Sequence, residues 1–229
     1  MHHPIYLFRH GETVWNAERR AQGHLDSPLT AAGREQARAM GQRLAEELRL
    51  AGYEPAGVVV RASPLGRVRE TLSIAAEAAG LAHDEQCLDH RLREMSWGDW
   101  DGLTGVEIEA RWPGAMAARR LDHWNYRPPA GESYVMAVER ARPALDEIAM
   151  LAAERPVAVF AHGGIGRVLR GLFLRVPDAE ILTMDQPQDA FYRLHGGAAA
   201  RIGTQAEQQG RASEPARPFH TGAGSQDRR

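Results

Sequence analysis

The sequence lacks several features that define common protein classes. Its single cysteine, Cys87, excludes an intramolecular disulfide and the cysteine-rich zinc modules. No stretch approaches the roughly 18 to 20 apolar residues that a helix needs to cross a bilayer. The first nine residues have no basic segment followed by a long apolar one, so we expect no signal peptide. These absences predict a cytoplasmic protein with no membrane partner.

A surplus of charge of one sign is also absent. The 28 basic residues nearly balance the 30 acidic ones, which gives a formal net charge of -2. We therefore expect no nucleic-acid partner, because no overall field would attract one. Every one of the 28 basic residues is arginine. This favours planar guanidinium groups, which bind phosphate and carboxylate through two hydrogen bonds, although a GC-rich genome would produce the same bias.

What the sequence does contain is an alternation of short apolar runs with helical patterns. Residues 5–8, 58–60 and 157–161 are typical of buried strands, and residues 190–194 and 199–202 of a hairpin. Helices are predicted after Thr30, over residues 65–79, after Ser133 and over residues 165–174. This order predicts an α/β fold with a mainly parallel central sheet and helices on both faces.

We expect one domain over residues 1–203 with a small cap. The stretch from about 95 to 132 is loop-rich and carries four tryptophans among glycines and prolines, which predicts a cap insertion with one or two short helices. Its aromatic residues either line a binding pocket or fill the core between cap and sheet. Residues 204–229 are rich in Gln, Gly, Ser and Pro, which predicts a disordered tail.

Two histidines follow predicted strands directly. His10 lies in the run Arg9-His10-Gly11-Glu12, and His162 precedes Gly163-Gly164. Taken alone, either one is more simply interpreted as a structural histidine than as a functional one. Ligands of parallel sheets bind outside the carboxyl ends of the strands, so neighbouring strands would place both imidazoles in one crevice.

Three further residues are candidates for the same crevice. Arg9 could hold an anion through its guanidinium fork. Arg67 stands at the start of a predicted helix, where a cation without a partner is unfavourable, so a bound anion could explain its presence there. Alternatively, Arg67 faces solvent or pairs with Glu70. Glu94 lies among apolar residues and tryptophan, a setting suited to a proton donor, and could instead pair with Arg91 or Arg93.

The order of these motifs resembles the histidine phosphatase superfamily, also called the phosphoglycerate mutase-like family. The resemblance rests on the Arg9-His10-Gly11-Glu12 strand end, on Ser63-Pro64-Leu65 with Arg67, on Glu94 and on His162-Gly163-Gly164. It implies a three-layer α/β/α fold with His10 as the nucleophile that accepts the phosphoryl group. It further implies that Glu94 is the proton donor and that the phosphate is bound by the group Arg9, Asn16, Arg67, His162 and Gly163.

Within this family the sequence is more similar to the broad-specificity and alpha-ribazole phosphatases than to the mutases. Mutases resemble one another in following the acidic residue with Arg-His-Tyr, whereas here Met95-Ser96-Trp97 follows Glu94. We therefore expect a phosphomonoesterase that hydrolyses small phosphorylated metabolites without a metal or another cofactor. The alternatives are a cofactor-dependent phosphoglycerate mutase and a non-catalytic protein that binds phosphate ligands. The sequence leaves a homodimer open.

Overall fold

A single five-stranded sheet forms the centre of the molecule. The structure is a computed structural model that describes residues 3–204. The strands lie in the order β2-β3-β1-β4-β5. Three strands, β1 (Ile5–Arg9), β2 (Val59–Ala62) and β3 (Val157–Ala161), run parallel, whereas β4 (Ala190–His195) is antiparallel to β1 and pairs with β5 (Ala198–Gly203). The predicted mainly parallel sheet is confirmed, and the hairpin forms its antiparallel edge.

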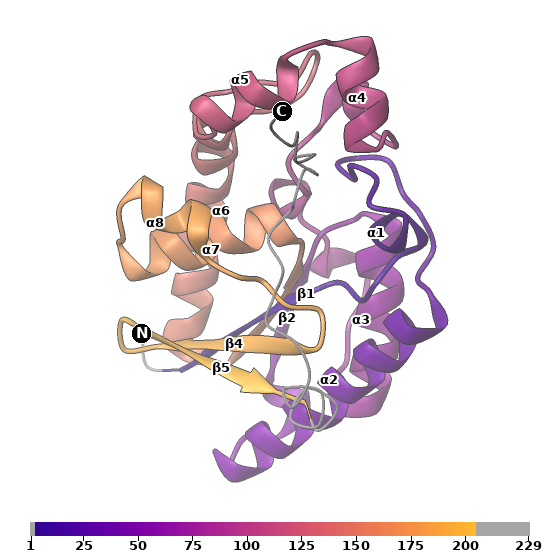
Figure 1. Cartoon of the computed structure of the whole chain (residues 1–229). Helices are drawn as coiled ribbons and strands as arrows, with labels where there is room; N and C mark the ends of the chain where they lie inside the picture. Colours follow the sequence, from indigo (N-terminus) through magenta and orange to yellow (C-terminus); the bar gives the residue numbers. More distant parts are fainter. Residues whose placement is uncertain (1–2, 205–229) are drawn as a thin grey trace, which may run out of the picture.

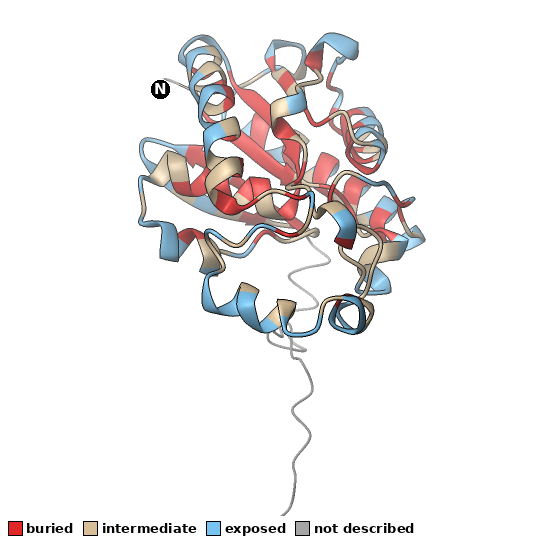
Figure 2. Ribbon diagram, turned by 90° about the horizontal axis from the view of Figure 1, so that it is seen from above, coloured by how far each residue is buried: buried red, intermediate tan, exposed pale blue. Residues whose placement is uncertain are grey.

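Helices cover both faces of this sheet (Figure 1). Alternate side chains of β1 belong to different cores. Tyr6 and Phe8 pack toward α2 (Ala31–Leu50) and α3 (Gly66–Ala79), whereas Ile5 and Leu7 pack toward α6 (Tyr134–Glu154) and α7 (Gly163–Leu174). Figure 2 shows the buried residues gathered on the sheet and on the helix faces turned toward it. The predicted three-layer α/β/α architecture is therefore present. The long helices are α2 (Ala31–Leu50), α3 (Gly66–Ala79), α6 (Tyr134–Glu154) and α7 (Gly163–Leu174).

Local sequence signals set the ends of these helices. The Thr30 side chain accepts a hydrogen bond from the Gly33 N–H at the start of α2, and Ser133 does the same for Met136 in α6. Gly80 ends α3 in the left-handed conformation, with φ 70°. Helix α7 begins two residues earlier than the apolar pattern predicts, so that Gly163 and Gly164 form its first turn.

Shorter elements connect the main ones. The cap segment contains α4 (Gly105–Arg111) and α5 (Ala115–Leu121), which Figure 1 shows together beyond one end of the sheet. The loop after β1 joins this segment, since the Ala21 N–H donates to the Leu103 carbonyl. The sequence carried no clear signal for two short helices, α1 (Val14–Ala17) and α8 (Asp178–Thr183). Single 3-10 turns lie at Pro55–Gly57, Glu85–Cys87, His90–Leu92 and Gly98–Trp100.

The predicted tail from residue 204 on lies outside the described residues except for its first member. Thr204 is buried, and its N–H and hydroxyl both donate to the Asp189 carbonyl. No helix within residues 3–204 is long and apolar enough to cross a membrane.

Candidate active site

The two strand-end histidines meet at the carboxyl edge of the sheet. Strands β1 and β3 are adjacent and parallel, and Arg9 pairs with Ala161 in their register. The next residues, His10 and His162, consequently lie side by side, with ring centroids 5.2 Å apart and planes at 64°. Both are buried, with exposures of 4% and 0%. The structure thus brings together two residues that lie 152 positions apart in the chain.

The hydrogen bonding of His10 fixes which nitrogen is free. Its Nδ1 lies 2.8 Å from the Gly11 carbonyl oxygen. A carbonyl can only accept, so Nδ1 carries the proton and Nε2 keeps its lone pair. Burial, together with the positive charges of Arg67 and Arg9, lowers the pKa of His10 well below 6.5. His10 is therefore a neutral imidazole near pH 7, with a nitrogen available for attack.

His162 is held in a similar electrostatic environment. Its Nε2 lies 2.7 Å from the Ser63 hydroxyl oxygen, and its Nδ1 is buried with no partner among the described residues. Burial and the charge of Arg67, then the proximity of His10, lower the pKa of His162 well below 6.5. Ser63 comes from the Ser-Pro turn after β2, a motif that the sequence singled out without assigning Ser63 a contact.

Arg9 and Arg67 supply positive charge close to the histidine pair. The Arg9 guanidinium donates to the Gln186 carbonyl at 2.9 Å and lies against Gly163, where an added Cβ would sit 3.4 Å from it. Burial lowers the pKa of Arg9 to about 10, so it remains charged at neutral pH. The Nε atoms of both arginines are buried without a partner in residues 3–204. Buried donors of this kind are expected to bind an anion.

Arg67 is anchored in a way that the sequence did not reveal. Its side chain is fully buried and donates to Asp26 at 2.8 Å and to the carbonyls of Gly23 and Leu25. It neither faces solvent nor pairs with Glu70. Asp26 also accepts from the backbone N–H groups of Gly66 and Arg67. The anion at the start of α3 is therefore the carboxylate of Asp26, which offsets the cost of a cation there.

The Glu94 carboxylate contacts the first turn of α7, directly beside the second histidine motif. Its carboxylate accepts from the N–H groups of Gly164 at 2.9 Å, Ile165 at 3.0 Å and Met95 at 2.9 Å. It pairs with neither Arg91 nor Arg93. Arg91 binds Asp89 and Glu147, and the Arg93 guanidinium donates to the His90 carbonyl.

The backbone around Glu94 is held by a separate ion pair. Arg140 of α6 binds Glu132 at 2.9 Å and donates to the carbonyls of Arg91, Arg93 and Glu94. Glu132 also accepts from the Ser96 N–H at 2.9 Å. This explains the Gly131-Glu132-Ser133 motif, since Glu132 positions the segment that carries Glu94.

Asn16 lies on α1 and completes the set of residues that the sequence singled out. Its side-chain oxygen accepts from the Thr13 N–H at 3.2 Å and from Gln188 at 2.8 Å. The latter contact comes from the segment before β4, which carried no sequence signal.

A second cluster of positive charge lies near these residues, and the sequence did not predict it. Arg167 of α7 approaches the Tyr134 hydroxyl at 3.4 Å, and Arg119 of α5 stacks on Trp97 at 4.7 Å. No ion pair of either arginine is found within residues 3–204. Burial and these two cations lower the pKa of His123 to about 4. Within the described residues, the Nε2 of His123 and the Nε of Arg167 are buried and have no hydrogen-bond partner.

The aromatic residues of the cap mostly pack on one another. Trp100 is fully buried and contacts Trp97, Trp112 and Tyr126, with ring centroids 5.7 to 6.3 Å apart. Trp124 stacks on Tyr134 at 5.5 Å. These rings form a small core within the cap and against α6, which is the second of the two roles that the sequence left open.

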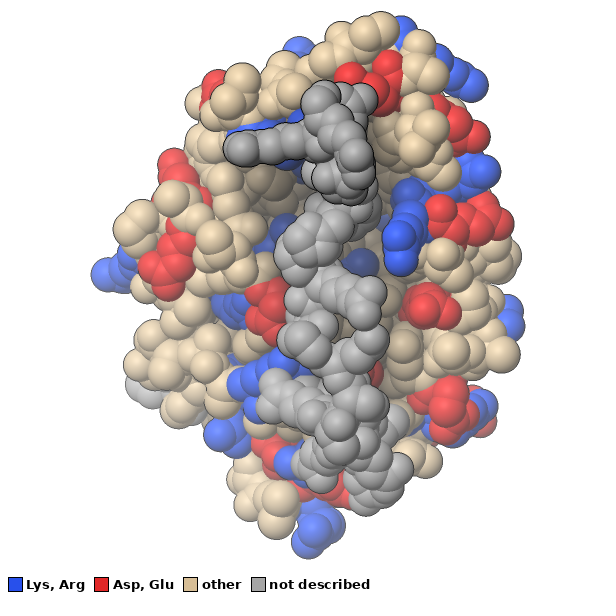
Figure 3. Space-filling model, in the orientation of Figure 1, with Lys and Arg blue, Asp and Glu red and all other residues tan. Residues whose placement is uncertain are grey.

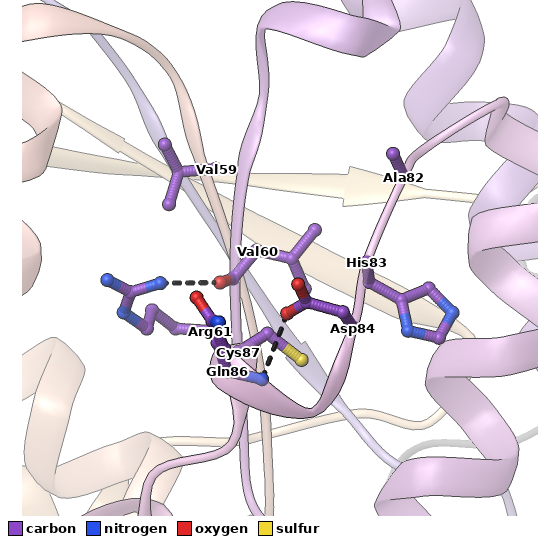
Figure 4. Close-up of a pocket in the computed structure, with 8 residues that line it drawn as sticks. All are labelled: Val59, Val60, Arg61, Ala82, His83, Asp84, Gln86 and Cys87. Atoms are coloured by element: carbon purple, nitrogen blue, oxygen red, sulfur yellow. Dashed lines mark hydrogen bonds between the residues drawn. The ribbon is translucent and has the colours of Figure 1, made fainter.

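Two surface hollows lie apart from this constellation. One, of about 370 Å³, lies beside the edge strand β2 and is lined by Arg61, His83, Asp84 and Cys87 among others (Figure 4). The other, of about 450 Å³, lies between α7, α8 and the hairpin and is lined in part by Arg170, Asp185 and Tyr192. Basic and acidic residues are both scattered among uncharged ones on the face drawn in Figure 3. No group of three or more His, Cys, Asp or Glu within the described residues is arranged to hold a metal ion.

Fold and site together define a three-layer α/β protein with a buried pair of histidines, flanked by arginines, at the carboxyl edge of its sheet. The sequence matches the family model of the histidine phosphatase superfamily (branch 1) over residues 5–200. The chain belongs to this superfamily, and the resemblance inferred from its motifs is confirmed.

Known relatives include both phosphatases and mutases. The chain is 34% identical over 180 residues to a glucosyl-3-phosphoglycerate phosphatase of Mycolicibacterium vanbaalenii, covering 76% of this chain and 75% of the relative. It is 40% identical over 165 residues to a protein of Serratia proteamaculans named "Probable phosphoglycerate mutase GpmB", covering 69% of each. The solved alpha-ribazole phosphatase of Shigella flexneri shares the fold, with a TM-score of 0.71, 22% identity, and coverage of 88% of this chain and 95% of that one.

Proposed function

We propose that the chain is a phosphomonoesterase that works through a phosphohistidine on His10. The observation that carries the proposal is the meeting of a neutral, buried His10 with Arg9, Arg67 and His162 at one sheet edge. In the first step Nε2 of His10 attacks phosphorus, the ester P–O bond breaks, and Glu94 protonates the departing alkoxide. In the second step Glu94 takes a proton from water, whose oxygen attacks phosphorus. The P–N bond then breaks and inorganic phosphate leaves.

The charges of the site support such a reaction without a metal. Phosphoryl transfer depends mainly on positioning and on stabilising charge at the phosphoryl oxygens. Two buried guanidinium groups provide that charge, while the imidazole of His162 and the carboxamide of Asn16 add hydrogen-bonding groups. The charge also keeps His10 neutral, since it lowers the pKa of that imidazole. One arrangement thus binds a phosphate dianion and preserves the nucleophile.

The second cationic cluster supports a substrate that carries another anion. Arg119 and Arg167 have no carboxylate partner within the described residues, and Arg167 acts electrostatically on Arg9. A carboxylate on the leaving group, as in phosphoglycerates and their derivatives, would bring a partner for these cations. The names of these two relatives agree with this class, because both contain the word phosphoglycerate.

A phosphoglycerate mutase is the second candidate. The relative from Serratia proteamaculans favours it. The residues Met95-Ser96 after Glu94 offer no charged group that would hold a carboxylate there, so hydrolysis by water remains the first candidate. A non-catalytic phosphate-binding protein is disfavoured because the candidate nucleophile and the candidate acid are both present.

Phosphate release from p-nitrophenyl phosphate and from 3-phosphoglycerate, measured in the presence of a chelator, tests the proposal. We expect hydrolysis of both esters, and isomerisation of phosphoglycerate slower than its hydrolysis even with a bisphosphoglycerate primer. Arg167→Met should raise KM for 3-phosphoglycerate by a larger factor than KM for p-nitrophenyl phosphate, which has no second anion. Arg142→Met on α6 serves as the matched control. Absence of hydrolysis of every ester in a panel of metabolite monophosphates would refute the proposal.

A further inference from the structure

The segment of residues 184–189 between α8 and β4, here called the strap, lies beside the candidate phosphate site. It has no regular secondary structure. From it, the Gln186 carbonyl accepts from the Arg9 guanidinium at 2.9 Å, and the Gln188 side chain donates to the Asn16 side-chain oxygen at 2.8 Å. Arg9 is the last residue of β1 and Asn16 follows that strand closely, whereas the strap lies more than 160 positions further along the chain.

Both ends of the strap are fixed to neighbouring elements. Asp185 accepts from the Tyr192 hydroxyl and from Arg170, whose guanidinium lies 3.7 Å from the Tyr192 ring centroid. Burial alone would raise the pKa of Asp185, but the Tyr192 hydroxyl and the charges of Arg170 and Arg201 lower it overall, so the anchor is ionised. At the other end the Asp189 carbonyl accepts twice from Thr204. Pro187 further restricts the backbone between the anchors.

The contact with Gln188 fixes the orientation of the Asn16 carboxamide, and with it the direction in which the NH₂ group can donate. The Asn16 oxygen accepts from two N–H groups, those of Thr13 and Gln188, which together occupy its two lone pairs. Its own N–H groups then remain for an acceptor such as a phosphoryl oxygen. Without Gln188, only the Thr13 contact at 3.2 Å opposes a flip that would turn the oxygen toward the anion.

We infer that Gln188 is a positioning residue that orients Asn16 for phosphate binding, and that the strap holds Arg9 and Asn16 in register through Gln186 and Gln188. This inference rests on the proposed function, because it assumes that these residues surround a phosphate. It assigns a task to a segment that the family motifs do not include. Gln188 acts through Asn16 and does not itself contact the substrate.

A double-mutant cycle tests the inference, with calorimetric binding of inorganic phosphate and of vanadate as the readout. Gln188→Ala should raise Kd for both ions about three- to tenfold, the range expected for one lost hydrogen bond. Gln188→Met, which keeps the length of the side chain and removes the donor, should do the same. In an Asn16→Ala background, neither substitution should change Kd by more than about twofold. Gln42→Ala on the exposed face of α2 is the control.

The outcomes separate this inference from the proposed function. Additive effects of Gln188 and Asn16, or an unchanged Kd for both Gln188 variants, would overturn the positioning role. So would a wild-type chain that binds neither ion. If the cycle shows the expected coupling while the wild-type chain hydrolyses no phosphate ester, the proposed function fails and the positioning role stands. If Gln188→Ala does not fold, Gln188→Met alone completes the cycle.

Discussion

Replacing Glu94 by glutamine should separate its chemical role from its structural one. The carboxylate accepts three backbone N–H groups, and only one of its oxygens contacts Gly164. Glutamine can keep one oxygen for Met95 and Ile165, but its NH₂ group would then face the Gly164 N–H. Loss of that hydrogen bond should cost about 1–3 kcal/mol. For a chain of this size, this lowers Tm by roughly 2 to 12 °C.

The kinetic loss from Glu94→Gln should depend on the leaving group. Removal of a general acid typically costs about 100- to 10,000-fold in rate. An alkyl phosphate such as 3-phosphoglycerate releases a strongly basic alkoxide and should lose that full factor in kcat/KM. A p-nitrophenolate ion needs little protonation, so kcat/KM for p-nitrophenyl phosphate should fall less than about tenfold.

The assay compares kcat/KM for the two esters, because this ratio reports only the steps up to the first irreversible one. Turnover at saturation would also include the hydrolysis of the phosphohistidine, in which Glu94 is needed for every substrate. Glu139→Gln, an exposed residue of α6, controls for the change of charge. Equal losses for both esters in Glu94→Gln would refute the role of Glu94 as the acid. An unchanged Tm would refute the structural argument.

Three further predictions concern the histidines and metal. Rapid quench of the wild-type chain in alkaline denaturant, with ester labelled in its phosphate, should trap a covalent phosphate that His10→Ala lacks, because the P–N bond of a phosphohistidine survives alkali. A label retained by that variant would place the nucleophile elsewhere. The pKa values of His10 and His162 in the folded chain lie below 6.5, so at a pH below 6.5 the unfolded chain binds more protons than the folded one. The contribution of the two neutral histidines to stability is therefore complete above pH 6.5 and is lost as the pH falls toward their folded pKa values. Thermal unfolding between pH 7.5 and 5.5 should therefore show a flatter decline in Tm for His162→Asn, and an unaltered slope would contradict this. Chelators should leave turnover unchanged, whereas a loss restored by a divalent cation would exclude the metal-independent reaction.

The sequence was sufficient for features that depend on local chemistry. Apolar runs and capping residues predicted the strands and the helix ends, because burial and capping act within a few residues. Two His-Gly motifs after buried strands, together with the rule for parallel sheets, predicted that His10 and His162 meet. The α/β class therefore followed from the pattern of the chain itself, whereas the candidate nucleophile followed from the resemblance of its motifs to the histidine phosphatase superfamily.

Only the tertiary structure decided which partners these side chains have. Asp26 pairs with Arg67 at the start of α3, although the two lie 41 positions apart. Glu94 receives its N–H donors from α7, and Asn16 receives one from Gln188. Such contacts depend on the packing of whole elements, and no local pattern distinguishes Gln188 from an ordinary surface glutamine. The sequence by itself determined the fold class and the reactive groups, whereas the folded chain determined the orientation and charge of those groups, since both depend on distant neighbours and on burial.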